Sequence, residues 1–259
     1  MYDVVVRTYN SSRTLERCLE SVATYLRPHR VIVVDHRSTD GTVEIARSRG
    51  AEVISEEGGL CYASYIGSAS ADCPTVVYVD SDVEIVSPVF KRVVEGNGGS
   101  VVVGCSTSNA FLYGIPLCAT AVPRQVAISS FLGTSCFGRE TYYLMRAVRR
   151  ERLRVIHVPG VYVHRAYHRS NRDWPVWQGA MAAMVSGGSL MQAASSVFTS
   201  FLMLAGSRSM KNGLYFPVFS ARLLWGFANY RRYPAGPRPS EPPHQDSGMI
   251  PQGPDEGQP

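Results

Sequence analysis

The first hundred residues alternate short runs of β-branched residues with helix-like patterns, and this alternation restricts the folds open to the chain. Val4-Val5-Val6 and Val31-Ile32-Val33-Val34 have the composition of buried strands. Apolar residues at helical spacing lie between them: Leu15, Cys18, Leu19 and Val22. Strands joined by crossover helices pair in parallel. The pattern therefore predicts an α/β fold with a mostly parallel, Rossmann-like sheet flanked by helices.

The same alternation continues to about residue 103. The second helix should begin near Thr42 and end at Gly50, with Ser38 or Thr39 as its N-cap. Further elements are expected at these positions: strands over 51–55, 75–79 and 101–103, a helix over 61–71, and two later strands over 155–159 and 161–164.

Composition divides the chain into three expected regions. With 45% apolar residues in 259, the chain can bury a full core, which we place in residues 1–170. Residues 171–232 are expected to be helical. Residues 233–259 are polar and proline-rich and lack the apolar side chains that would offset the entropy of ordering, so they are expected to form a disordered tail.

The cysteines and the first residues predict a reducing compartment. The six cysteines include no C-x-x-C pair, which argues against a zinc site and a disulfide framework and favours buried free thiols. No export signal precedes the first strand. We therefore expect a cytoplasmic protein.

Charge is distributed unevenly along the chain. Residues 121–233 hold 15 Lys or Arg against three acids, whereas residues 1–120 hold 10 against 14. A basic second half suits phosphate-rich ligands or an anionic membrane surface. No nucleic-acid-binding motif accompanies the charge, so no nucleic-acid partner is expected.

Polar residues follow several strands where a parallel sheet binds ligands, at the carboxyl ends. They include Arg7-Thr8-Tyr9-Asn10, Asp35-His36-Arg37 and Asp80-Ser81-Asp82. Neither a G-x-G-x-x-G nor a P-loop motif is present. The two-residue period of a strand would point Asp80 and Asp82 to one side, where their oxygens could hold Mg²⁺ or Mn²⁺ beside a diphosphate.

Three blocks together resemble family 2 glycosyltransferases. They are Val4 to Ser11, Val33 to Thr42 and Val77 to Asp82, in the family's order and spacing. The resemblance implies a GT-A fold, a nucleotide-sugar donor such as a UDP- or GDP-sugar, a divalent cation and transfer with inversion. The acceptor would be a glycan or a lipid-linked molecule.

The resemblance also assigns residues to the donor and metal sites. Thr8 and Tyr9 would line the nucleoside pocket, Asp35 would bind the base or ribose, and Asp80 would face the ribose or sugar. Asp82 would be the principal metal ligand, and a histidine at the position of His164 completes the metal site in related enzymes. A local hydrogen bond is the alternative for His164. The expected donor site also includes Asn10, Arg37 and Ser81.

The sequence departs from the family pattern at two places. His36-Arg37 stands where the family has a second acid after Asp35. Ala63-Ser64-Tyr65 stands where the family often has Ala-Arg-Asn, which removes a cation from the donor site. Arg7, Arg37 or the basic second half could replace that cation.

The general base should be a carboxylate within reach of the acceptor hydroxyl. Few acids lie in the second half of the chain, and Glu140 is the first candidate and Asp173 the second. Glu140 precedes residues 155–159 at the spacing of the family's acidic pair, with Thr141 in place of the second acid. Under a competing alignment of residues 133–140, the acidic pair is deleted and Glu140 merely begins a helix.

Residues 174–207 contain no charged residue, and arginines and aromatic residues follow. Residues 174–232 could lie peripherally in the membrane interface, on its cytoplasmic face, or could form a buried helical hairpin. Two rival functions also remain open. One is a catalytically degenerate sugar-nucleotide binding module, and the less favoured one is a nucleotidyltransferase, which usually has a glycine-rich basic loop after its first strand.

Overall fold

The computed structural model describes residues 1–105, 114–132, 140–165 and 210–232, together with single residues and short stretches between 176 and 198. The expected disordered tail, residues 233–259, lies outside the described residues. Cys18, Cys61, Cys73 and Cys118 are buried free thiols, as predicted, whereas Cys105 is half-buried.

A seven-stranded sheet forms the centre of the fold, in the order β3-β2-β1-β4-β7-β6-β8. Its strands are β1 (Tyr2–Thr8), β2 (Val31–Asp35), β3 (Glu52–Ser55), β4 (Thr75–Asp80), β6 (Val101–Val103), β7 (Ala119–Pro123) and β8 (Val155–His157). The pairs are parallel except those that β7 makes with β4 and β6. This confirms the mostly parallel sheet that the sequence predicted.

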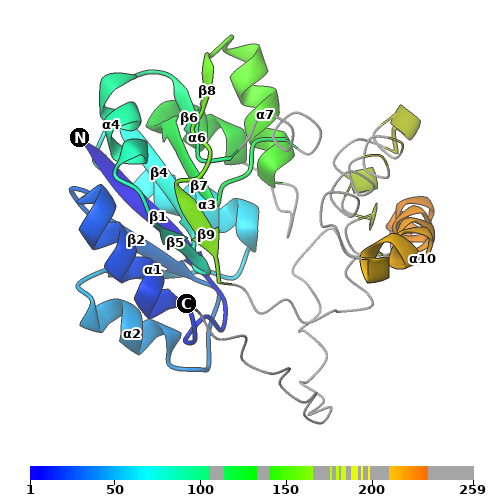
Figure 1. Ribbon diagram of the computed structural model, residues 1–259, viewed down its shortest axis with the longest axis horizontal. Helices are drawn as coiled ribbons and strands as arrows, with labels where there is room; N and C mark the ends of the chain where they lie inside the picture. The colour runs from blue at the N-terminus through cyan, green and yellow to red at the C-terminus, as the bar shows by residue number, and fades with distance from the viewer. Residues whose placement is uncertain are drawn as a thin grey trace.

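Helices cover both faces of the sheet (Figure 1). On one side lie α1 (Leu15–Ser21), the π-helical turn Val22–Leu26, α2 (Thr42–Ser48) and α4 (Val89–Gly96). On the other side lie α3 (Leu60–Ser70), α6 (Arg124–Phe131) and α7 (Glu140–Arg150). Each helix buries its apolar face against the sheet, as crossover helices do.

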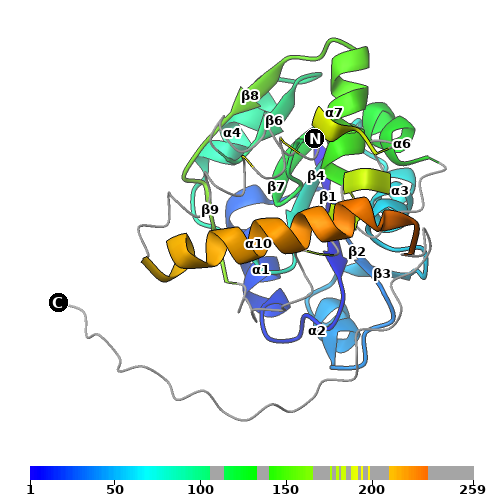
Figure 2. The ribbon, with the colours of Figure 1, turned by 90° about the vertical axis from the view of Figure 1, so that its right-hand side faces the viewer.

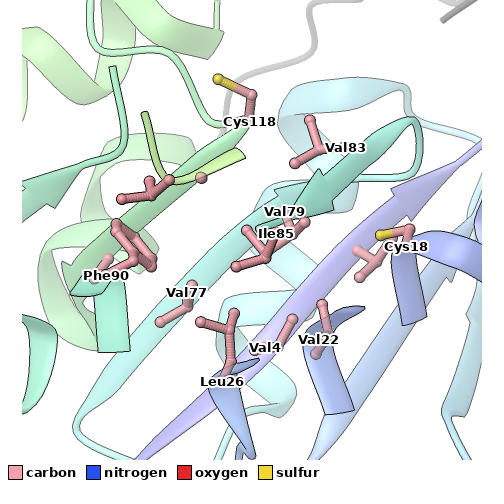
Figure 3. Packing of buried hydrophobic residues seen from close by; sticks show 14 of the residues in the cluster. Val4, Cys18, Val22, Leu26, Val77, Val79, Val83, Ile85, Phe90 and Cys118 are labelled. Carbon is pink, nitrogen blue, oxygen red and sulfur yellow. The ribbon is translucent and has the colours of Figure 1, made fainter. Parts of the chain in front are cut away.

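The period of the strands explains the two cores. Val4 and Val6 belong to one buried cluster, whereas Val5 belongs to the cluster on the opposite face. Figure 3 shows the first cluster, where Leu26 and Phe90 pack beside Val77 of β4. Gly67 lets α3 approach closely, because a Cβ there would lie 2.5 Å from Val5. Buried apolar area of this kind supplies most of the driving force for folding.

Two short strands lie beside the main sheet as a separate ribbon. β5 (Val83–Ile85) pairs antiparallel with β9 (Tyr162–His164), and Val83 faces His164. The later strand was predicted, but β5 was not. Because Val83 directly follows Asp82 in the chain, this pairing brings Asp82 close to His164.

The predicted N-cap of α2 is wrong. The helix begins at Thr42, as expected, but Gly41 precedes it with a φ of 85°, and no side chain caps it from that position. Asp40 instead accepts hydrogen bonds from the backbone N–H and the hydroxyl of Thr42. Ser38 and Thr39 lie too early to cap the helix because the loop continues to Gly41.

Helix α10 (Met210–Ala228) lies beyond the α/β domain and crosses the front of Figure 2. Its backbone closely approaches Val176 and Gly179, because a Cβ at Gly179 would lie 1.8 Å from the carbonyl oxygen of Leu223, and a Cβ at Gly226 would lie 1.8 Å from that of Val176. Leu223 and Phe227 are buried. Among the described residues, no helix is long and apolar enough to cross a membrane.

Candidate active site

The carboxyl ends of β1, β2 and β4 meet at one edge of the sheet. β1 lies between β2 and β4, so the chain reverses its direction of strand addition beside β1. Such a point in an open α/β sheet is where ligands bind. Thr8 is paired with Asp35, and Arg7 with Asp80. The structure therefore brings three of the predicted strand-end groups together.

Asp35 is held in a buried network. Its carboxylate accepts hydrogen bonds from the Thr8 hydroxyl at 2.7 Å, from the Ser38 backbone N–H at 2.8 Å and from the Ser38 hydroxyl at 2.6 Å. The loop after β2 folds back onto the strand end and supplies the two hydrogen bonds from Ser38. The carboxylate oxygens of Asp35 are therefore fixed in position before a ligand arrives.

The loop after β1 is fixed to the loop after β2. Asn10, at a φ of 47°, donates its backbone N–H to Ser38, and its side-chain oxygen accepts the N–H of Thr39 at 3.0 Å. Tyr9 remains 41% exposed, and its ring meets that of His36 edge to face at 5.5 Å between centroids. Asn10 thus shapes the loop, while Tyr9 presents an accessible aromatic face.

Glu56 is a buried acid that the sequence analysis missed. Its Oε1 lies 2.8 Å from Nδ1 of His36, and its Oε2 accepts the N–H of Gly59 at 2.8 Å. Arg37 instead points to the surface, where it forms an exposed ion pair with Glu57 at 3.2 Å. The position that holds a second acid in the family is therefore occupied by an imidazole with its own carboxylate partner. The unusual His36 was the signal that could have indicated this pair.

Asp80 and Asp82 point to different partners. Asp80 ends β4, but Asp82 lies in the turn before β5, so the two-residue strand period that was expected to align them does not apply. Asp80 binds the guanidinium of Arg7, whereas Oδ1 of Asp82 lies 3.6 Å from Nδ1 of His164. Ser81, between them, lies 2.9 Å from the hydroxyl of Ser11. Both carboxylates lie at the ligand-binding edge, as predicted, but a turn and not the strand period places Asp82 there.

His164 lies among groups that favour its protonated form. The contact with Asp82 is the largest cause, and together with Cys118 it outweighs burial and raises the pKa of His164 to about 10. The antiparallel pairing of β5 and β9 fixes this contact. The structure thus brings His164 beside Asp82.

Arg7 is the buried cation of the site. Its side chain is 4% exposed, and it binds Asp80, lies 3.4 Å from Oε1 of Glu140 and donates to the Ser64 hydroxyl at 3.3 Å. Burial lowers the pKa of Arg7, but the charges of Asp80 and Glu140 outweigh burial and raise it. Ser64 is the residue that stands where the family often has arginine. Arg7 therefore reaches from β1 into the space that a shorter side chain on α3 leaves.

Glu140 begins α7 and faces this cation. Buried Leu144 and Val148 hold the helix against the sheet, which directs its first turn toward the end of β1. Glu140 is thus both a helix-start acid and a member of the strand-end cluster. Asp173, the second candidate base, lies outside the described residues, as do residues 133–139 of the competing alignment.

Comparison with protein families identifies the first part of the chain. The model described as "Glycosyl transferase family 2" matches residues 3–105, the segment that carries Arg7, Asp35, Asp80 and Asp82. This part of the chain belongs to glycosyl transferase family 2. The match agrees with the family that the three sequence blocks predicted for this segment.

Solved structures show the same fold. The chain aligns with glucosyl-3-phosphoglycerate synthase from Mycobacterium tuberculosis in complex with Mn²⁺, UDP-glucose and phosphoglyceric acid. That alignment has a TM-score of 0.55 and 22% identity over 72% of this chain and 79% of the synthase. A UDP complex of the synthase gives a TM-score of 0.53 and 23% identity over 70% and 76% of the two chains. None of the curated proteins compared matches the sequence. The structural likeness confirms the GT-A fold.

Proposed function

We propose that the protein transfers a sugar from a nucleoside diphosphate sugar, such as a UDP- or GDP-sugar, to an acceptor hydroxyl or lipid phosphate, with inversion. The observation that carries this proposal is the cluster at the carboxyl ends of β1 and β4, where Arg7, Asp80 and Glu140 lie in contact. The solved relative was crystallised with Mn²⁺ and UDP-glucose, which supports a donor of this kind.

The residues present fit a divalent cation beside a diphosphate. Asp80 and Asp82 offer carboxylate oxygens, and His164 offers an imidazole nitrogen 3.6 Å from Asp82. Oxygen ligands with one imidazole suit Mn²⁺ and, less well, Mg²⁺. When bound, the ion supplies positive charge to the diphosphate leaving group. His164 would give up its proton to act as a ligand.

The donor would lie over the ends of β1 and β2. Thr8 and Asp35 would face the nucleoside, with Tyr9 as an aromatic wall and Arg37 at the exposed rim. Asn10 and Ser81 would contribute through the loops that they hold. The buried hydrogen bonds of Asp35 support this assignment because they fix its oxygens before a ligand arrives.

Glu140 would act as the general base. It would accept the acceptor's hydroxyl proton while the acceptor oxygen bonds to the anomeric carbon and the bond from that carbon to the diphosphate breaks. Arg7 is then a positioning residue, since it holds Glu140 and Asp80 a fixed distance apart. Asp173 stays a second candidate on sequence grounds alone.

The rival is a sugar-nucleotide binding module without turnover. The observation in its favour is the ion pair between Glu140 and Arg7. During catalysis, Glu140 would have to contact the acceptor hydroxyl as well as Arg7. Thr141, in place of the family's second acid, leaves no adjacent carboxylate to substitute for it. The two functions differ in turnover but not in donor binding.

The acceptor side is proposed to lie at a membrane surface on its cytoplasmic face. Large apolar side chains are exposed on and before α10, at Leu190, Met191, Phe198, Val218, Leu224 and Trp225. Arg222 and Arg231 lie on the same segment. Apolar side chains beside arginines suit peripheral binding to anionic lipid. The tight contact through Gly179 and Gly226 supports a packed hairpin with one exposed face.

The decisive experiment incubates the full chain with a panel of nucleotide sugars and with Mn²⁺ or Mg²⁺. A glycosyltransferase releases nucleoside diphosphate, and chelation of the metal stops the release. Acceptors should include small phosphorylated hydroxy acids and lipid phosphates, since the solved relative was crystallised with phosphoglyceric acid. Donor binding without turnover for every pair would favour the binding module.

A further inference from the structure

A second cluster of metal-ligating side chains lies at the opposite edge of the sheet from the proposed donor site. Asp3 stands near the start of β1, His29 precedes β2, and Cys73 precedes β4. These three strands are neighbours in the sheet. Ligand atoms of the three residues lie within 4.8 Å of one another. The cluster is therefore built by segments far apart in the sequence.

Backbone hydrogen bonds fix the positions of all three residues. One carboxylate oxygen of Asp3, Oδ2, accepts the N–H groups of Asp72 at 2.7 Å and Cys73 at 2.9 Å. The N–H of His29 donates to the carbonyl of Tyr2 at 3.0 Å. The cluster thus rests on the ends of paired strands and is not a chance meeting of flexible surface side chains.

The second oxygen of Asp3 is unsatisfied. Asp3 is 0% exposed, and its Oδ1 has no hydrogen-bond partner among the residues that the structure describes. A buried carboxylate oxygen without a partner is costly. A bound metal ion would give this oxygen the partner that it lacks.

Arg30 acts on Asp3 through its charge but makes its contacts with other groups. It lies 3.2 Å from Glu52 and 3.4 Å from Asp72, and its guanidinium also donates to the carbonyl of Ser70. Among the described residues, Oδ1 of Asp3 therefore still lacks a hydrogen-bond partner.

We propose that Asp3, His29 and Cys73 bind a divalent transition-metal ion, with Zn²⁺ preferred. A carboxylate oxygen, an imidazole nitrogen and a thiolate are each zinc ligands, and a water molecule would complete a tetrahedral site. The thiol proton of Cys73 leaves to solvent as the sulfur–metal bond forms. Cys73 is buried and His29 is exposed, so the ion would enter from the side of His29. This site is independent of the proposed transfer reaction.

The simpler reading is that Asp3 only stabilises the turn before β4 and accepts the Cys73 thiol proton. The two readings differ in metal affinity. Co²⁺ is the probe, because a thiolate ligand gives it a charge-transfer absorption band in the near ultraviolet that oxygen ligands do not give. The metal-free full chain is titrated with Co²⁺, and Zn²⁺ affinity is then measured by competition with a chromophoric chelator.

We expect one equivalent of Co²⁺ to produce the band in the wild-type protein and in Cys118→Ala, and not in Cys73→Ala. Cys118 is the matched control because it is also a buried free thiol and lies near His164 in the proposed active site. His29→Ala changes an exposed residue and should keep the fold while weakening Zn²⁺ binding about tenfold or more. Absence of the band in wild type, its persistence in Cys73→Ala, its loss in Cys118→Ala, or unchanged affinity in His29→Ala would each overturn the proposal.

Discussion

Nη1 of Arg7 lies 3.4 Å from Oε1 of Glu140, and the same guanidinium binds the carboxylate of Asp80. The ring of Tyr78 lies 5.9 Å from the guanidinium carbon, which adds a favourable cation–π contact. One buried cation thus joins the end of β1, the end of β4 and the start of α7. Arg7 consequently holds the proposed base, Glu140, close to Asp80.

Arg7→Lys should weaken the contacts with Asp80 and Glu140 while keeping the positive charge at residue 7. An ammonium cannot reproduce the planar fork that contacts both carboxylates and Ser64. We expect turnover to fall about tenfold or more and the free energy of unfolding to fall by about 2 kcal/mol. Product release and chemical denaturation measure the two effects. Arg49→Lys, at an exposed ion pair with Glu16 and Glu20, is the control and should leave turnover unchanged.

Glu140→Gln should remove the proposed base with little change in shape. We expect turnover to fall by about 100-fold or more, because general-base catalysis contributes that much, while donor affinity stays nearly intact. Steady-state rates and calorimetric donor binding separate the two quantities. Glu151→Gln, which removes an exposed partner of Arg150, should have no effect. A Glu140→Gln enzyme with the wild-type rate would eliminate Glu140 as the base.

Asp82→Asn should weaken metal-dependent donor binding. Loss of one anionic ligand should lower turnover by about 100-fold and raise the Mn²⁺ concentration needed for half-maximal rate. His164→Ala should act in the same direction, with a smaller effect. Glu84→Gln is the matched control, because Glu84 lies on the same β5–β9 ribbon but pairs with Arg165 at 2.8 Å. An equal Mn²⁺ dependence in Asp82→Asn and Glu84→Gln would contradict the metal assignment.

Asp40→Asn should destabilise the loop before α2 in a pH-dependent way. Burial acts to raise the pKa of Asp40, but hydrogen bonds from Thr42 and Ser12 outweigh it and lower the pKa below its ordinary value. The stabilisation is therefore complete above the unfolded-state pKa of about 4 and is lost as pH falls through the lower folded-state value. Because Asp40 is exposed, solvent screens part of the effect, and we expect a deficit of only about 0.5 kcal/mol at pH 7 that shrinks below about pH 4. Denaturation curves at pH 7 and below about pH 4 measure this deficit in the free energy of unfolding. The same deficit at both pH values would show that the ionisation of Asp40 plays no part.

Trp225→Ser should reduce binding to anionic vesicles. Trp225 is 58% exposed on α10, whereas Leu223 and Phe227 on the same helix are buried. Removing the exposed indole should lower the vesicle-bound fraction without lowering stability, since little buried area is lost. Flotation with anionic and with neutral vesicles measures the change. Tyr62→Ser removes an exposed aromatic residue of α3 and should leave vesicle binding unchanged.

The sheet was predictable because local signals and tertiary packing agree there. Val4 to Val6 and Val31 to Val34 are apolar on both faces, as strands buried in a parallel sheet must be. β5 was not predictable, since Val83-Glu84-Ile85 acquires its partner only from residues 162–164. The strand signal is weak at three residues, and long-range pairing decides the outcome.

The site was predictable by position but not by contact. The strand-end motifs placed Asp35, Asp80 and Asp82 at the correct edge of the sheet. The direction of Asp82 depends on a turn, and the partners of Asp35 depend on the return of the following loop. The sequence left open which residue replaces the missing cation. Arg7 could not be chosen over the other candidates, because the choice depends on which side chain is buried and long enough to reach the site. For Glu56 the signal was indirect: His36, at the position of the family's second acid, was the residue that could have indicated a carboxylate partner.

Strand β1 carries Asp3 near one end and Arg7 and Thr8 at the other, and all of its seven residues are buried. A strand of this length spans about 20 Å. A one-residue insertion within it would turn every following side chain to the opposite face, so Arg7 would leave Asp80 while Asp3 kept its place. Selection for the residues at either end of β1 should therefore keep the length of this strand constant. Insertions in related chains should fall in the loops around β1.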